Sequence, residues 1–237
     1  AMYGAMFLGQ KGAALEAVYR LREEVPDEVV KLYPDIFETF VAAAPHVYIR
    51  FGMWDEITNL EQPEDKKLYV TTNALVYYAK AVAYAILGKH KEAENCVEQF
   101  ANAYALVPES RHLFNNKSRD VLEIANEMML GEVAFKSGNK TEGLNHLRQA
   151  VELDDNLNYE EPWSWPQPTR HALGALLLEV GNYEEAEVVY KADLGIDGKL
   201  PRPSQHPKNV WALHGLHECL KHRNDKIELP HVAFLLQ

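Results

Sequence analysis

Apolar and polar positions follow a helical period along the chain, and glycines interrupt that period. In the clearest stretch, Leu173 and Leu177 lie four residues apart and therefore share one face of a helix. Gly181 ends this stretch, and Tyr183 and Tyr190 continue a second helical pattern. Because glycine adopts the left-handed backbone beyond a helix end without steric cost, the pattern predicts two helices joined by a short turn.

The same pattern recurs at three other glycines. They are Gly52, Gly88 and Gly138, and each is followed within two or three residues by a new amphipathic stretch. Successive turn glycines are 36, 50 and 43 residues apart, and the longer intervals contain insertions at 107–119 and 154–168. The chain is therefore predicted to be all-α, an α-solenoid of antiparallel helix hairpins with essentially no strand.

Small and aromatic residues also recur at fixed offsets. The set Gly174, Leu177, Gly181, Tyr183, Ala186 and Tyr190 shares its spacing with residues 131–150 and 81–97. A longer pattern runs through 50–57, 78–81, 161–170 and 209–216. The sequence resembles the tetratricopeptide repeat, a unit of about 34 residues, and is similar to a group of uncharacterised tetratricopeptide-domain proteins. This resemblance implies a right-handed superhelix and brings no reaction with it.

The repeat spacing gives an expected domain organisation. We expect one repeat domain over residues 5–237, after a cloning remnant or frayed start at 1–4. Its degenerate units are expected at about 35–66, 74–107, 124–156 and 167–199, with final helices at 208–237. Whether the chain is complete or is a piece of a longer protein stays open.

Charge and cysteine content narrow the classes of function. The chain has 24 Lys and Arg against 35 Asp and Glu, a formal net charge of −11. An acidic chain repels a phosphate backbone, so no nucleic-acid partner is expected. No apolar stretch approaches the roughly 20 residues that span a bilayer, so no membrane partner is expected either. Cys96 and Cys219 lie far apart, which favours two buried thiols in a reducing compartment and a cytoplasmic protein.

The first helix of each hairpin lines the concave face of a tetratricopeptide array, and the turn glycines set which positions point inward. These candidate groove residues are His46, Arg50, Tyr78, Met128, Glu132, His171 and Glu179. Their mixture of imidazole, phenol, carboxylate and guanidinium groups suits a small ligand or the end of a peptide. It also suits an ordinary solvated groove. A register error of one residue would turn a side chain by about 100°.

Two histidine groups raise the question of a metal. His46, Glu132 and His171 have the donor types that zinc or iron takes, but their spacing follows no metal-binding motif. His214, His217 and His222 lie along a terminal helix, where ring packing is the favoured interpretation. We therefore predict no bound metal and no cofactor.

Aromatic residues gather in the insertion at 154–168. Tyr159, Trp163 and Trp165, with Arg170 just beyond, form a candidate rim that has the groups to stack on a ring or hold a carboxylate. The structural alternative is that the tryptophans fill the gap opened by the insertion. We favour the structural alternative.

These observations favour a binding scaffold whose groove or aromatic rim receives a peptide, a partner protein or a small ligand. Two alternatives stay open. One is a metal-assisted or acid/base enzyme with its site in the groove, although no catalytic motif supports it. The other is a structural oligomerisation domain in which the apolar segment 231–236 contacts a second copy of the chain.

Overall fold

The computed structural model describes residues 1–237 and divides the chain into two compact units. The first unit comprises Ala1–Met6 and Gln10–Gln167, and the second comprises Phe7–Gly9 and Pro168–Gln237. The expectation of one continuous repeat domain over 5–237 stays a prediction.

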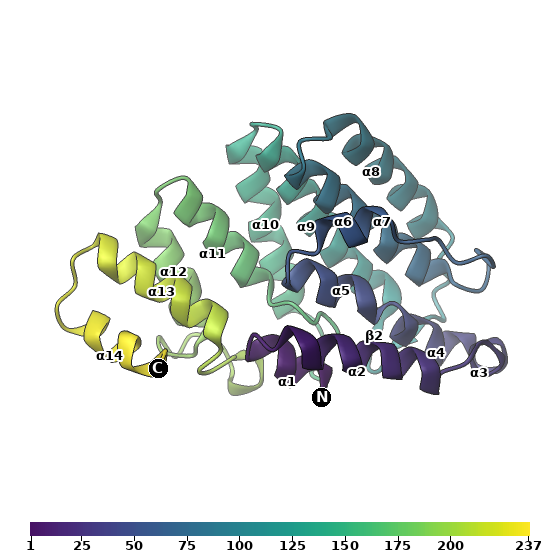
Figure 1. Ribbon diagram of the computed structural model, residues 1–237, viewed down its shortest axis with the longest axis horizontal. Helices are drawn as coiled ribbons and strands as arrows, with labels where there is room; N and C mark the ends of the chain where they lie inside the picture. The colour runs from purple at the N-terminus through teal and green to yellow at the C-terminus, as the bar shows by residue number, and fades with distance from the viewer. The chain divides into compact units, whose positions relative to one another are not determined.

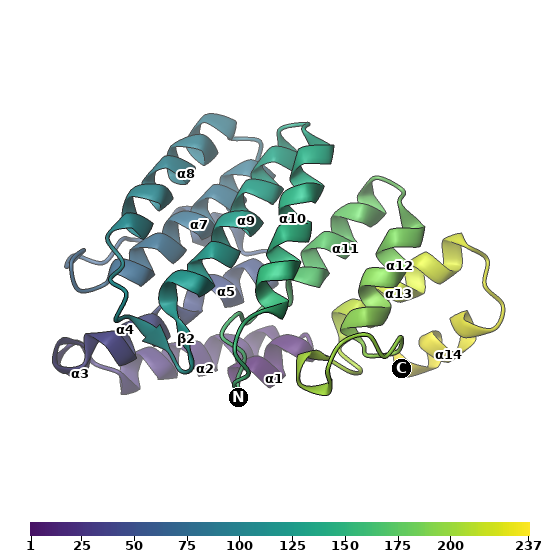
Figure 2. The ribbon, with the colours of Figure 1, turned by 180° about the vertical axis from the view of Figure 1, so that it is seen from behind.

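Helices build the first unit (Figure 1). In chain order they are α1 (Met2–Phe7), α2 (Lys11–Glu24), α3 (Asp27–Leu32), α4 (Pro34–Val41), α5 (Ala43–Arg50), α6 (Trp54–Thr58), α7 (Val70–Ile86), α8 (His90–Ala105), α9 (Ser118–Lys136) and α10 (Lys140–Asp155). Helix α7 packs against both α8 and α9, and α9 packs against α10. Consecutive helix hairpins therefore stand side by side, as both views show (Figure 2).

The second unit is also helical. It contains α11 (Thr169–Glu179), α12 (Tyr183–Asp193), the 3₁₀ turn η1 (Arg202–Ser204), α13 (Val210–His222) and α14 (Glu228–Leu235). Helix α12 packs against both α11 and α13. The predicted all-α solenoid of helix hairpins is confirmed.

Strand is confined to one small hairpin between α8 and α9. Strands β1 (His112–Leu113) and β2 (Asn116–Lys117) pair antiparallel, and β1 contacts α4. Phe114, in the turn, has a φ of 50°, a left-handed conformation that few bulky residues adopt. This hairpin replaces part of the first predicted insertion with ordered structure.

The four predicted turn glycines all have left-handed backbone. Their φ angles are 63° at Gly52, 73° at Gly88, 99° at Gly138 and 76° at Gly181. A residue with a Cβ atom is strained in this region, so glycine is the residue that closes each turn at the lowest cost. The predicted hairpin turns are therefore confirmed.

Close helix packing in the second unit depends on a tyrosine between two glycines. A Cβ atom on Gly174 of α11 would lie 2.5 Å from the Tyr190 ring, and one on Gly215 of α13 would lie 2.1 Å from it. Tyr190 of α12 therefore fills the space that these two glycines leave. The predicted close approach at Gly174 is confirmed, and Gly215 extends it to a third helix.

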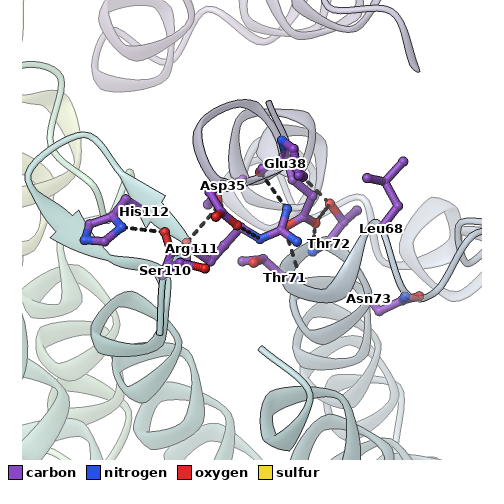
Figure 3. A network of polar contacts seen from close by, with 12 residues as sticks. Asp35, Glu38, Leu68, Thr71, Thr72, Asn73, Ser110, Arg111 and His112 are labelled. Atoms are coloured by element: carbon purple, nitrogen blue, oxygen red, sulfur yellow. Dashed lines mark hydrogen bonds and ion pairs between the residues drawn. The ribbon is translucent and has the colours of Figure 1, made fainter. Parts of the chain in front are cut away.

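Helix α7 begins against a buried carboxylate (Figure 3). Glu38 of α4 accepts hydrogen bonds from the backbone N–H groups of Thr71 and Thr72, at 3.2 and 2.7 Å, and from the Thr72 hydroxyl at 2.6 Å. The first N–H groups of a helix lack partners within it and carry partial positive charge, so the carboxylate stabilises the start of α7. Buried Arg111 forms ion pairs with Glu38 at 3.8 Å and Asp35 at 3.5 Å, which offsets the desolvation of Glu38.

The two cysteines, Cys96 and Cys219, are buried free thiols, as the sequence predicted. Burial raises the pKa of both thiols, to about 12 for Cys219. None of the helices combines the length and the apolar character that crossing a bilayer requires.

Candidate functional site

Two of the predicted groove residues surround a buried tryptophan in the first unit. The ring centroid of Trp165 lies 4.9 Å from that of His46 and 5.6 Å from that of Tyr78. All three side chains are buried, Trp165 at 2% exposure. The sequence hypothesis placed the tryptophans against the third and fourth helix pairs, whereas Trp165 packs on α5 and α7. The insertion therefore covers the inward face of earlier hairpins.

Three more candidate groove residues lie in the same unit. Met128 is buried, whereas Arg50 and Glu132 are half-buried. Burial raises the pKa of Glu132 to about 7, against the opposing effect of Lys136. The pKa of Tyr78 is well above its ordinary value, chiefly because the phenol is buried and also because of the Glu132 charge, while Arg50 acts in the opposite direction. His46, Arg50, Tyr78 and Glu132 thus belong to one cluster with little access to solvent.

The remaining two candidate groove residues, His171 and Glu179, lie in the second unit. Glu179 is exposed at the end of α11. The buried His171 ring contacts Asp193, with 2.9 Å between Nε2 and Oδ2. A single ligand site shared by all seven residues stays a prediction.

Asp193 is the centre of a polar cluster that the sequence analysis missed. Its buried carboxylate also contacts Nδ1 of His206 at 2.8 Å and accepts a hydrogen bond from the Asn209 side chain at 2.8 Å. Burial acts to raise the pKa of Asp193, but His171 and His206 hold it well below its ordinary value. The available signal was a single aspartate at the end of an apolar helix face, followed by histidine and asparagine after the next prolines.

The second histidine group, His214, His217 and His222, shows a packing contact. The ring of His222 stacks on Tyr183 with centroids 3.9 Å apart and an interplanar angle of 11°. Across the chain, no three His, Cys, Asp or Glu side chains gather in a metal-binding arrangement. Proposals of a metal at His46, Glu132 and His171 stay without geometric support.

The other members of the candidate rim have different surroundings from Trp165. Trp163 is half-buried, Tyr159 is 57% exposed, and Arg170 is half-buried on the first turn of α11 in the second unit. Asparagines of the β-hairpin hold the insertion: Asn116 exchanges hydrogen bonds with the backbone of Asn158 at 2.8 and 3.0 Å. The sequence gave no indication of this contact between the two insertions.

A cavity of about 600 Å³ lies in the first unit. Its walls come from α1, α2, α4, α5, α7, α9, the β-hairpin and residues 162–166, and they are mostly apolar. The rings of Tyr3, Phe40, Phe114 and Trp163 form much of the wall, with Phe40 and Phe114 edge to face at 4.9 Å. The Tyr3 hydroxyl donates a hydrogen bond to the carbonyl of Trp163, which ties α1 to the insertion.

A second hollow, of about 360 Å³, lies along α7 and α8. Tyr77, Lys80 and Tyr84 line it from α7, at positions that share one helix face. From α8 it is lined by Lys91, Glu92, Asn95 and Cys96. No candidate groove residue of the sequence analysis lies in this hollow.

Comparison with known protein families identifies part of this architecture. Residues 74–104 match the tetratricopeptide repeat family, and they cover most of the α7–α8 hairpin. The chain therefore contains a tetratricopeptide repeat, as its sequence pattern predicted. A comparison with curated proteins finds no match.

Proposed function

We propose that the protein is a binding scaffold that holds a segment of a partner protein along the α7–α8 hairpin. The observation that carries this proposal is the tetratricopeptide match to this hairpin, because such repeats generally mediate contacts between proteins. The hollow along α7 and α8 offers a surface on the matched repeat itself.

The side chains of this hollow favour a segment with both apolar groups and carboxylates. Tyr77 and Tyr84 are half-buried and present ring surface that an apolar side chain can cover. Lys80 and Lys91 outnumber the single carboxylate of Glu92. In a chain with a formal net charge of −11, this local excess of positive charge supports a partner segment with acidic residues.

A third lysine strengthens the electrostatic argument. The ammonium group of Lys89 lies 5.8 Å from the centre of the Tyr84 ring, within the range of a cation–π contact. It adds positive charge beside the hollow without occupying a carboxylate. Three lysines thus surround the tyrosine at this end of the hairpin.

Photo-crosslinking tests the proposal. The photoreactive residue p-benzoylphenylalanine replaces Tyr84, and the crosslinked partner is identified by mass spectrometry. We expect the crosslink to disappear when Lys80→Glu and Lys91→Glu are combined, because both variants repel an acidic segment. The matched control combines Lys11→Glu and Lys31→Glu, two exposed lysines of the same unit outside the hollow, and should retain the crosslink. Persistence of the crosslink after reversal of Lys80 and Lys91 would contradict the proposed charge recognition.

A further inference from the structure

The 600 Å³ cavity of the first unit is a separate site from the α7–α8 hollow. The two share no lining residue, and α7 contributes only Leu75 to the cavity. Segments outside the matched repeat form most of the cavity wall, in particular α1, α2, the β-hairpin and residues 162–166. A ligand in this cavity would therefore not compete directly for the hollow.

The volume and the wall select for a compact apolar ligand with rings. Cavities of about 300–1,000 Å³ hold drug-sized molecules. Tyr3 and Trp163 face each other as one ring pair, with centroids 5.9 Å apart, and Phe40 and Phe114 form another. Aromatic walls of this kind favour flat ring systems, which stack or pack edge to face against them.

The charges around the cavity favour a neutral ligand. The only oppositely charged side chains in its wall, Arg20 and Glu24, pair with each other at 2.7 Å and are largely exposed. His46 is the remaining ionisable base of the wall, and burial lowers its pKa to about 4, so the ring is neutral at pH 7. An ionic group on a ligand would lose its hydration without meeting a free opposite charge.

Two polar groups of the wall can each serve one hydrogen bond to a ligand. Nδ1 of His46 lies 3.5 Å from Oε1 of Gln167, which can only accept, so the ring proton belongs on Nδ1 and Nε2 is an acceptor. The Ser164 hydroxyl accepts a hydrogen bond from the Asn116 side chain at 3.1 Å, which leaves its own hydrogen to donate. Both side chains are more than nine-tenths buried.

We propose that this cavity binds a neutral, ring-containing small molecule with a single hydrogen-bonding group. Apolar contact with the four rings supplies most of the affinity, and His46 or Ser164 orients the polar group. The proposal goes beyond the partner-binding function, and neither depends on the other.

The test uses a pair of fluorescent probes that differ in charge. N-phenyl-1-naphthylamine is neutral, and 8-anilino-1-naphthalenesulfonate carries the same rings with a sulfonate. We expect saturable binding of the neutral probe at one site per chain, with enhanced fluorescence. The anionic probe should bind at least about tenfold more weakly, because its sulfonate meets no free cation. Equal affinity of the two probes would overturn the requirement for a neutral ligand.

Two alanines of α2 provide a matched pair of variants. Ala17 lines the cavity, whereas Ala13 is exposed on the same helix and does not. Ala17→Trp fills the cavity and should weaken the neutral probe by about tenfold or more, since the added ring competes for the same space. Ala13→Trp adds the same ring outside the cavity and should leave the affinity unchanged. Equal binding by both variants would place the probe elsewhere and overturn the proposal.

A third variant keeps the test decisive if Ala17→Trp fails to fold. Phe114 is 47% exposed, and its backbone has a positive φ that asparagine tolerates. Phe114→Asn removes one ring from the wall while retaining the turn of the β-hairpin. Circular dichroism confirms folding, and affinity for the neutral probe should fall. An unchanged affinity in a folded Phe114→Asn protein would contradict the proposed ring-lined site.

Discussion

The two segments that connect hairpins at 156–167 and 194–209 look alike in sequence, because both are rich in proline and polar residues. Their contacts differ. The first places the Trp165 ring against His46 and Tyr78. The second brings His206 and Asn209 to the buried carboxylate of Asp193. The first connection is therefore held mainly by apolar burial, and the second by charge-assisted hydrogen bonds.

This difference determines which changes each unit tolerates. A ring buried among rings is sensitive to lost volume, since the surrounding side chains relax only partly into a cavity. A buried carboxylate is sensitive to the loss of its charge, because its donors then stay desolvated without an ionic partner. The same kind of proline-rich segment thus fixes one unit by shape and the other by charge.

Removing the Trp165 ring should give the largest effect. Trp165→Ala leaves a large void between α5 and α7, and we expect it to lower the free energy of unfolding by about 3–5 kcal/mol. Urea unfolding followed by circular dichroism measures the change. The same measurement on Trp163→Ala, at a half-buried position, should show a smaller loss.

Trp165→Phe separates the ring from its polar atom. The indole N–H of Trp165 is buried without a hydrogen-bond partner, so phenylalanine loses volume but no hydrogen bond. We expect Trp165→Phe to be less destabilised than Trp165→Ala by a clear margin. If the two variants were equally unstable, ring burial would not be the main contribution of this side chain.

Neutralising Asp193 should give the next largest effect. Asp193→Asn keeps the shape of the side chain but replaces a carboxylate that contacts two histidines, and we expect a loss of about 2–3 kcal/mol in the free energy of unfolding. Glu184→Gln, an exposed change on the same helix, is the control and should alter stability by less than about 0.5 kcal/mol. Wild-type stability of Asp193→Asn would show that charge is not what holds the second segment.

The hairpins could be predicted because their signals are local. A glycine that must adopt positive φ and the apolar residues three and four positions away lie within one short stretch, as at Gly88 and Gly181. The inward direction of His46 and Tyr78 also followed from this register. What covers these side chains did not follow, because Trp165 comes from a segment far along the chain.

The cavity and the Asp193 cluster are products of such distant contacts. The cavity needs Tyr3, Phe40, Phe114 and Trp163 together, and no repeat spacing relates these four residues. Asp193 and His206 lie on either side of a proline-rich segment whose path periodicity does not describe. Helical patterns therefore predicted the hairpins, while the sites formed by inserted and terminal segments required the structure.

The smallest expected effect sharpens the comparison within the first unit. Burial lowers the pKa of His46 to about 4 and raises that of Glu132 to about 7. As the pH falls from about 6.5 to 5, unfolded chains protonate His46 while the folded protein does not, so this residue makes acidification destabilising. Over the same range the folded protein protonates Glu132 while unfolded chains do not, so that residue makes acidification stabilising. The two contributions oppose each other in the wild-type protein.

Single variants should expose each contribution. Glu132→Gln removes the stabilising response, so its free energy of unfolding should fall from pH 6.5 to pH 5 more steeply than that of the wild type. His46→Gln removes the destabilising response, so its stability should rise relative to the wild type over the same range. Urea unfolding at several pH values measures both slopes, and the sign of each difference is the result that matters. Parallel slopes in all three proteins would mean that neither group is buried in its less charged form, and the contrast between an apolar first unit and an ionic second unit would fail.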